Sequence, residues 1–297
     1  MENIEEDKTT LSEEERNRRN SIILSQKPLR RLEILRLDYT FSVMVPLIMA
    51  IYLNNLNIMA HIDLLAGFFL FAITGNTLND MLDARKAGDN EAETIERIRG
   101  FHWKELATIS ITAFIFGSML FSRTTEQHPQ NLFILAIIVI MVVLYCVKKN
   151  IPVVNQILLG ISHVFLPYLM IKIDAGTTPL LTGAEWFLMT TFFFFAFTGQ
   201  IVHEIIDGDS ITRFKPKVQQ IIVLSSSVAT IILGIITVFI TSNIYFIPFV
   251  IIPIGSIYTF RKPTHSTKGV KDVGIILGNV ILVYFLVLIF RAQFYIV

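Results

Sequence analysis

The chain has 297 residues, of which 53% are hydrophobic and only 16% are charged, and its mean hydropathy is +0.60. This composition excludes an ordinary soluble domain and predicts an integral membrane protein. The formal net charge of +1 gives no indication of a nucleic-acid partner, and the single cysteine, Cys146, excludes an intrachain disulfide and a CxxC metal site.

Residues 1–37 are polar and highly charged, and they contain no apolar core near Met1 of the kind that a secretory signal needs. We therefore expect a cytoplasmic tail over 1–37 and a membrane domain over 38–297. Arg36 stands at the end of this tail, where the first apolar segment begins.

Nine apolar segments follow one another along the membrane domain. A helix that crosses a bilayer needs roughly 17–25 residues, so each segment with its flanking residues predicts one span. The segments are centred on residues 39–53, 64–78, 106–121, 132–147, 157–171, 186–202, 221–240, 246–260 and 273–290. The sequence thus predicts an all-α bundle of about nine transmembrane helices.

The distribution of Lys and Arg predicts the orientation of these spans. Basic residues are concentrated in the tail and after the second, fourth, sixth and eighth segments, whereas Arg123, Lys172 and Arg291 are left for the other side. Because short cytoplasmic loops are enriched in Lys and Arg, we expect the N-terminus and the loops after even-numbered spans to be cytoplasmic.

The second and sixth segments end in a repeated sequence. Phe71-Ala-Ile-Thr-Gly-Asn-Thr-Leu-Asn-Asp-Met-Leu-Asp83 and Phe195-Ala-Phe-Thr-Gly-Gln-Ile-Val-His-Glu-Ile-Ile-Asp207 lie 124 positions apart and share Phe, Ala, Thr, Gly and the final Asp. Helical spacing places their polar residues on one face of each helix. The two polar stripes are Asn76, Asn79, Asp80 and Asp83, and Gln200, His203, Glu204 and Asp207. The repeated Thr-Gly also predicts a close approach of neighbouring helices.

These stripes predict a binding site for Mg²⁺. A lone acid at a helix end is usually just solvated, but both stripes begin at least one turn inside the apolar run, where polar groups normally face the bundle interior or a water-filled cavity. Carboxylate and amide oxygens are ligands that Mg²⁺ accepts, usually together with substrate phosphates. Basic residues in the adjoining loops are candidates to hold those phosphates, namely Arg97, Arg99, Lys148, Lys149, Arg213, Lys215 and Lys217.

Several motifs resemble those of the UbiA superfamily of intramembrane prenyltransferases. Asn79-Asp-Met-Leu-Asp83 resembles the first half of the Asp-rich motif Asn-Asp-x-x-Asp-x-x-x-Asp, and Glu204-Ile-Ile-Asp207-Gly-Asp209 resembles the second Asp-rich motif. Ile34-Leu-Arg36-Leu is similar to the arginine that begins the family's first span. The segment 97–105 and Lys148-Lys149 with Asn155 are similar to its basic loops.

The resemblance implies a helical bundle with a central cavity open to the cytoplasmic side and to lipid. It further implies Mg²⁺-dependent transfer of a prenyl group from an isoprenoid diphosphate to a lipophilic or aromatic acceptor. Carried over to this sequence, it makes Asp83 and Asp207 essential for turnover. The implied metal ligands are Asn79, Asp80, Asp83, Glu204 and Asp207, and the implied diphosphate-binding residues are Arg36, Arg97, Arg99, Lys148 and Lys149.

The sequence also departs from the family pattern. The acid that should close the first motif is replaced by Ala87, with Asp89 two residues on, and Ile211 and Arg213 stand where the second motif would have its closing Asp. Two alternatives therefore stay open: a terpene cyclase on the same fold, which needs no acceptor, and a non-catalytic or ion-transporting membrane protein. Possible accessory residues are Asn76, Asp89, Gln200, His203 and Asp209, while His163 and Asn279 lie within spans and either line the cavity or bond between helices.

Overall fold

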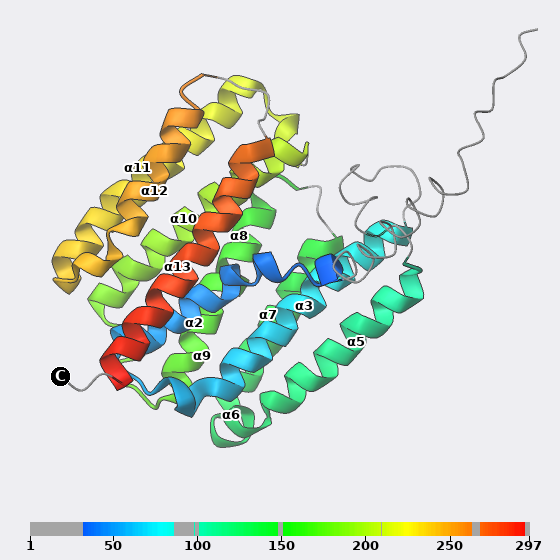
Figure 1. Ribbon diagram of the computed structural model, residues 1–297, viewed down its shortest axis with the longest axis vertical. Helices are drawn as coiled ribbons and strands as arrows, with labels where there is room; N and C mark the ends of the chain where they lie inside the picture. The colour runs from blue at the N-terminus through cyan, green and yellow to red at the C-terminus, as the bar shows by residue number, and fades with distance from the viewer. Residues whose placement is uncertain are drawn as a thin grey trace, which may run out of the picture.

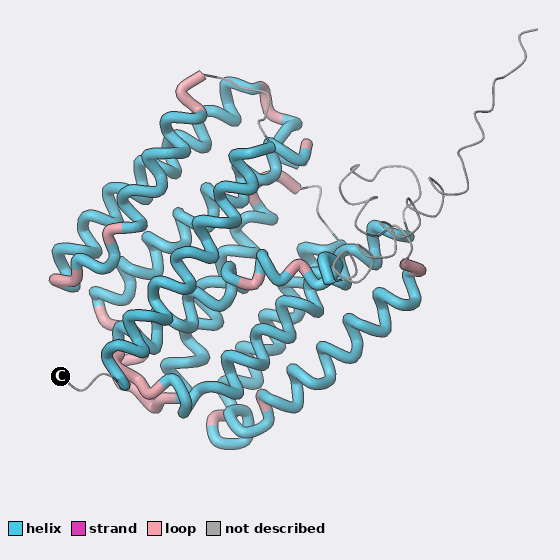
Figure 2. Tube along the Cα trace, viewed as in Figure 1, coloured by secondary structure: helices cyan, strands magenta, loops and turns pink. Residues whose placement is uncertain are grey.

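The computed structural model describes residues 32–85, 98, 101–147, 151–208, 210–262 and 268–294, and every regular element among them is helical (Figure 2). The all-α expectation is confirmed. The longer helices are α2 (Phe41–Leu53), α3 (Ile62–Arg85), α5 (Trp103–Leu120), α7 (Pro129–Val147), α10 (Gly183–Asp207), α11 (Pro216–Thr241), α12 (Pro248–Thr259) and α13 (Lys268–Phe294). Shorter ones are α6 (Ser122–Gln127), α8 (Val154–Gly160) and α9 (Leu166–Asp174), with a π-helix, Ile161–Phe165, joining α8 to α9.

Each of the nine predicted segments falls on a helix, in the expected order. Within the described residues, seven helical stretches are long and apolar enough to cross a membrane: Glu33–Leu53, Ile58–Ala84, Pro129–Val147, Val154–Asp174, Gly183–Asp207, Pro216–Thr241 and Gly269–Phe294. The third and eighth predicted spans, on α5 and α12, are not among the seven, so the count of nine stays a prediction. The chain is an integral, multi-pass membrane protein.

The outer surface of the bundle is apolar, as a lipid environment requires. Phe133 on α7 is 71% exposed and Phe239 on α11 is 77% exposed, and many other large apolar side chains also point outward. In Figure 1 the axes of the long helices are roughly aligned, so the helices lie side by side. A soluble protein rarely exposes so much apolar surface, whereas lipid tails cover it at no cost.

The sequence repeat reappears as two similar helix pairs, because α3 packs along α5 and α10 packs along α11 (Figure 1). In each pair the repeated threonine contacts the neighbouring helix. Ser110 on α5 donates a hydrogen bond to the carbonyl oxygen of Thr74, and Thr198 donates one to Ser226 on α11, at 3.1 Å and 2.8 Å. The two halves thus share an architecture as well as a motif.

The repeated glycine, Gly75 and Gly199, does not lie at a close contact between helices as expected. A Cβ atom added at Gly75 would meet Val142 at an ordinary 3.6 Å, and one at Gly199 would meet nothing within 4 Å. The prediction that this glycine permits close helix approach is therefore wrong, because both glycines line a cavity instead. The close contact in this half occurs at Gly117, where an added Cβ would lie 2.6 Å from the Phe71 ring.

A cluster of aromatic rings ties the helices of the second half to α2. The Phe249 ring on α12 lies 5.4 Å from that of Phe192 on α10 and 6.2 Å from that of Phe285 on α13. Tyr52 on α2 packs 5.6 Å from Phe285. Buried aromatic pairs of this kind contribute about 0.5–1.5 kcal/mol beyond the area that they bury. They fix the frame around the cavity described next.

Candidate active site

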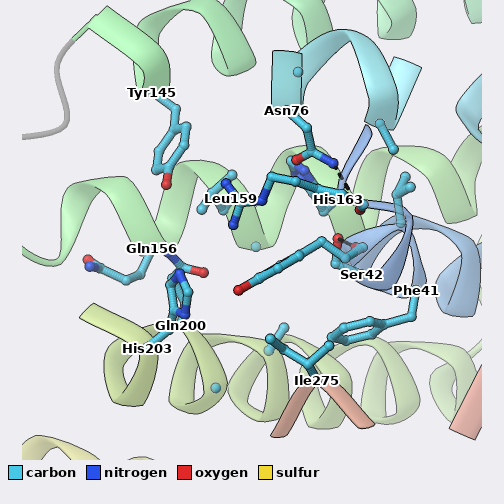
Figure 3. A pocket seen from close by; sticks show the side chains of 18 of the residues that line it. Phe41, Ser42, Asn76, Tyr145, Gln156, Leu159, His163, Gln200, His203 and Ile275 are labelled. Carbon is cyan, nitrogen blue, oxygen red and sulfur yellow. Dashed lines mark hydrogen bonds between the residues drawn. The ribbon is translucent and has the colours of Figure 1, made fainter. Parts of the chain in front are cut away.

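A cavity of about 1240 Å³ lies between the helices, and both repeated stripes face it. Figure 3 shows part of its lining, with side chains from different helices directed into one space. Its polar lining residues include Asn76, Asn79, Asp83, Gln200, His203, Asp207 and Lys271, and its aromatic ones include Phe41, Phe68, Phe71, Phe192 and Phe195. The cavity therefore has an ionic part next to an apolar interior.

On α3, three of the four predicted stripe residues line the cavity. The amide nitrogen Nδ2 of Asn79 donates to Asp83 at 3.3 Å, while the buried oxygen Oδ1 of Asn79 has no hydrogen-bond partner among the described residues. Asn76 donates to the backbone carbonyls of Leu35 and Arg36, at 3.4 Å and 3.3 Å. The fourth residue, Asp80, is fully buried and is not part of the cavity lining.

The stripe on α10 repeats this arrangement. Gln200, His203 and Asp207 line the cavity, whereas Glu204 is 3% exposed and is not part of the lining. Its carboxylate accepts a hydrogen bond of 2.7 Å from the hydroxyl of Ser210. Glu204 occupies the position equivalent to Asp80 in the repeat, so each half turns the same residue away from the cavity. That Asp80 and Glu204 are metal ligands stays a prediction.

Lys271, at the start of α13, belongs to the site although the sequence did not single it out. Its ammonium group lies 2.9 Å and 3.0 Å from the two carboxylate oxygens of Asp207, and both side chains are less than 10% exposed. Nε2 of His203 lies 3.0 Å from the same carboxylate. The signal in the sequence was weak, because Lys271 is one of several basic residues that precede the last apolar segment.

Arg36 approaches the cavity from the segment before α2. Its backbone is left-handed, with φ of +46°, and its guanidinium lies 4.1 Å from the centre of the Tyr39 ring. The buried Nε atom has no hydrogen-bond partner in the part of the chain that the structure describes. A left-handed non-glycine residue costs of order 1–3 kcal/mol, and such residues persist where the surrounding structure holds them. The hydrogen bond from Asn76 to the Arg36 carbonyl links this strained residue to the first stripe.

Among its described residues, the structure places none of the remaining basic and acidic candidates in the cavity lining. Arg213, Lys215 and Lys217 are exposed and are not part of its lining. The other candidates lie outside the described residues, namely Asp89, Arg97, Arg99, Lys148, Lys149 and Asp209.

No family model and no curated protein sequence matches the chain. Solved structures of a UbiA homolog from Archaeoglobus fulgidus do match in fold. The form bound to GPP and Mg²⁺ superposes with a TM-score of 0.64 at 16% identity, over 88% of this chain and 99% of the homolog. The forms bound to DMAPP and Mg²⁺ and to Cd²⁺ give TM-scores of 0.63 and 0.64 over the same shares, at 15% and 14% identity. The chain has the UbiA fold.

The residues of this UbiA fold can be tested for their fit to Mg²⁺. Within the described ranges, no group of three or more His, Cys, Asp or Glu side chains forms a ready-made metal cage. Mg²⁺ does not need one, because it is usually bound by one or two carboxylates together with substrate phosphates and water. The unpartnered oxygen of Asn79 beside the Asp83 carboxylate is a suitable partial ligand set.

Proposed function

We propose that this chain is a UbiA-type prenyltransferase, which moves a prenyl group from an isoprenoid diphosphate to a lipophilic or aromatic acceptor within the membrane. The observation that carries the proposal is that Asp83 and Asp207, from two separate repeats, line one cavity whose interior is apolar. The matching fold of a UbiA homolog that was solved with GPP or DMAPP and Mg²⁺ supports it.

In this proposal Asp83 and Asp207 hold Mg²⁺ because they are the acids of the repeated motif that line the cavity, and Asn79 joins them because its amide oxygen has no partner among the described residues. The bound Mg²⁺ would neutralise the negative charge that grows on the diphosphate as its bond to carbon breaks. Asp80 and Glu204 would join the ligand set only by turning their side chains toward the cavity.

The basic residues of the lining bind and orient the diphosphate. Arg36 offers a buried Nε–H that lacks a partner within the described ranges, and a guanidinium forms directional hydrogen bonds with phosphate oxygens. Lys271 supplies a second positive charge, and its contact with Asp207 fixes where that charge lies. Arg97, Arg99, Lys148 and Lys149 are proposed to complete the clamp.

The apolar part of the cavity shelters the reacting carbon. Breaking the bond to the diphosphate leaves an allylic cation, which water would quench. Aromatic faces such as those of Phe192 and Phe195 attract a cation and exclude water at the same time. The acceptor then forms a bond to the cation and releases a proton, while the diphosphate leaves with the electron pair of the broken carbon–oxygen bond. We further propose that the polar part of the cavity lies at the cytoplasmic face, as the Lys and Arg distribution predicts.

The test is an assay of the purified protein in lipid nanodiscs with Mg²⁺ and allylic diphosphates of several chain lengths, with and without acceptors. A product in which the prenyl group is joined to the acceptor supports the transferase. A hydrocarbon or alcohol that forms without acceptor supports a terpene cyclase, which the substitution at Ala87 leaves open. Failure to release diphosphate from any substrate would contradict both enzymes and favour a non-catalytic or ion-transporting protein.

A further inference from the structure

Gln156 differs from the other polar residues of the cavity because both atoms of its side-chain amide lack a hydrogen-bond partner among the described residues. It lies in the first turn of α8, is 1% exposed and lines the cavity (Figure 3). A buried polar group without a partner costs about 1–3 kcal/mol, and such groups in native proteins call for an explanation. A ligand in the cavity would provide one.

The described part of the cavity wall around Gln156 includes neutral polar side chains. Tyr145 on α7, Gln156 on α8 and Gln200 on α10 all line the cavity, and Figure 3 labels the three side chains. Among the described lining residues, the Arg36 guanidinium stacks on Tyr39 and the Lys271 ammonium is paired with Asp207. The neutral polar side chains of this wall bind a ligand through hydrogen bonds, so the hydrogen-bonding capacity of Gln156 decides which ligand fits.

The chemistry of the amide restricts the ligand further. Its nitrogen donates hydrogen bonds and its oxygen accepts them, so a matching ligand must both accept and donate. A diphosphate bound to Mg²⁺ offers only acceptor oxygens and would leave the oxygen of Gln156 unpaired. A hydroxyl group does both.

The backbone of the same wall has an unusual feature. The π-helix Ile161–Phe165 interrupts the passage from α8 to α9, and π-helical turns are frequent at functional sites. It carries His163, which lines the cavity and whose Nδ1 lies 2.9 Å from the hydroxyl of Ser162. The same wall thus carries the imidazole of His163 on the π-helix and the amide of Gln156 on α8.

We propose that Gln156 binds the hydroxyl group of the acceptor, which is a neutral phenol or alcohol. The proposal rests on the proposed transferase function and deepens it, since it gives the acceptor a chemical class. Gln156 sets specificity by hydrogen bonding, and the diphosphate stays with Arg36 and Lys271.

The test compares wild type with Gln156→Leu, which has a similar volume and no polar atoms. The matched control is Gln219→Leu, because Gln219 is also buried but lies outside the cavity lining and donates to the carbonyl oxygens of Thr212 and Phe214. Without ligand, Gln156→Leu should melt at or above the wild-type temperature, whereas Gln219→Leu should melt lower. A lower melting temperature for Gln156→Leu would show that the amide has a partner and would overturn the proposal.

Binding is then measured in nanodiscs with 4-butylphenol, its methyl ether and 4-butylbenzoate. Wild type should bind the phenol about 10–100-fold more tightly than the ether, as loss of a buried hydrogen bond predicts, and Gln156→Leu should bind both equally. Equal binding by wild type, an undiminished preference in Gln156→Leu, or stronger binding of the benzoate would each overturn the proposal.

A separate measurement keeps this proposal distinct from the proposed function. Stabilisation by geranyl diphosphate with Mg²⁺ should be the same in wild type and Gln156→Leu. If only the variant loses it, Gln156 belongs to the diphosphate site and the acceptor role is overturned. If wild type itself shows none, the transferase proposal fails, while the phenol preference is still decided by the measurement above.

Discussion

The acidic side chains at the two ends of α3 and α10 have different surroundings. At the N-terminal ends, Asp63 accepts hydrogen bonds of 2.6 Å and 2.9 Å from Arg123, and Glu185 lies 2.8 Å from the ammonium of Lys172. At the C-terminal ends, Asp83 and Asp207 face a large cavity. The same two helices thus carry acids that are paired within the packed protein at one end and acids that line a cavity at the other.

The polar side chains at the N-terminal ends of the two helices form hydrogen bonds and ion pairs with one another. Asn54 accepts from Lys172 at 2.6 Å and donates to Glu185 at 3.0 Å, and the Tyr168 hydroxyl donates to Glu185 at 2.7 Å. Nearby, Asp174 contacts both His61 and Arg123, with only its Oδ1 unpartnered. The hydrogen bond to Asp63 raises the pKa of Arg123 above its ordinary value.

At the cavity end, several buried polar atoms have no partner among the residues that the structure describes: Oδ1 of Asn79, Nε of Arg36 and both amide atoms of Gln156. A buried polar network stabilises a fold when its members satisfy one another, and incomplete satisfaction is costly. We infer that the N-terminal ends maintain the fold and that the cavity end binds ligands. Variants at the two ends should therefore affect different measurements.

The largest expected effect is the loss of turnover in Asp83→Asn. Removing one charge that stabilises a transition state typically lowers the rate about 10²–10³-fold, and the amide has nearly the same shape as the carboxylate. Release of diphosphate from geranyl diphosphate measures this effect, and the melting temperature without ligand serves as the control. Wild-type turnover in Asp83→Asn would remove this residue from the metal site.

Asp207→Asn should lose turnover to a similar degree, but it should also lose stability. The substitution leaves the buried ammonium of Lys271 without its carboxylate, and breaking a buried ion pair typically costs about 3–5 kcal/mol. The double variant Asp207→Asn/Lys271→Met should recover the melting temperature and not the turnover. Recovery of both would reduce Asp207 to a structural role.

At the opposite end, Glu185→Gln should lower stability by about 3–5 kcal/mol through the same loss of a buried charge partner, here that of Lys172. Diphosphate release by the fraction that remains folded should be unchanged. Chemical unfolding measures the first quantity and turnover per folded molecule the second. A selective loss of turnover would break the distinction between the two ends.

The smallest effect concerns Lys271→Gln. Removing a positive charge that lies 2.9 Å from Asp207 should favour cation binding there, so the Mg²⁺ concentration for half-maximal stabilisation should fall about 3–10-fold. The affinity for geranyl diphosphate should fall at the same time. Lys215→Gln, on the exposed surface, is the control and should change neither. An unchanged Mg²⁺ requirement in Lys271→Gln would show that Lys271 does not compete with the metal.

The sequence predicted the helical bundle well, because long apolar segments and a 124-residue repeat leave few alternatives in a membrane. It also predicted Asn79, Asp83, Asp207 and Arg36 as site residues from local properties, namely helical spacing and family motifs, and all four line the cavity. It could not separate Asp83 from Asp80, because which of two adjacent positions on a helix face reaches the cavity depends on how the helix is rotated in the bundle.

Two further residues required the tertiary structure. The contact of Lys271 with Asp207 joins residues 64 positions apart and arises only when α13 packs against the end of α10. Gln156 stands out because its amide atoms have no hydrogen-bond partners among the described residues, and no sequence pattern predicts this. Similarly, the repeated Thr-Gly predicted a contact correctly, but the threonine makes it and the glycine does not.

The central claim is that the two repeats bind one Mg²⁺–diphosphate group between them. Its most direct test is the binding of geranyl diphosphate to wild type, Asp83→Asn, Asp207→Asn/Lys271→Met and Glu185→Gln, with Mg²⁺ and with EDTA. We predict that binding requires Mg²⁺ and is lost in both cavity variants but kept in folded Glu185→Gln. Binding that survives EDTA, or that depends on only one of the two repeats, would contradict this account.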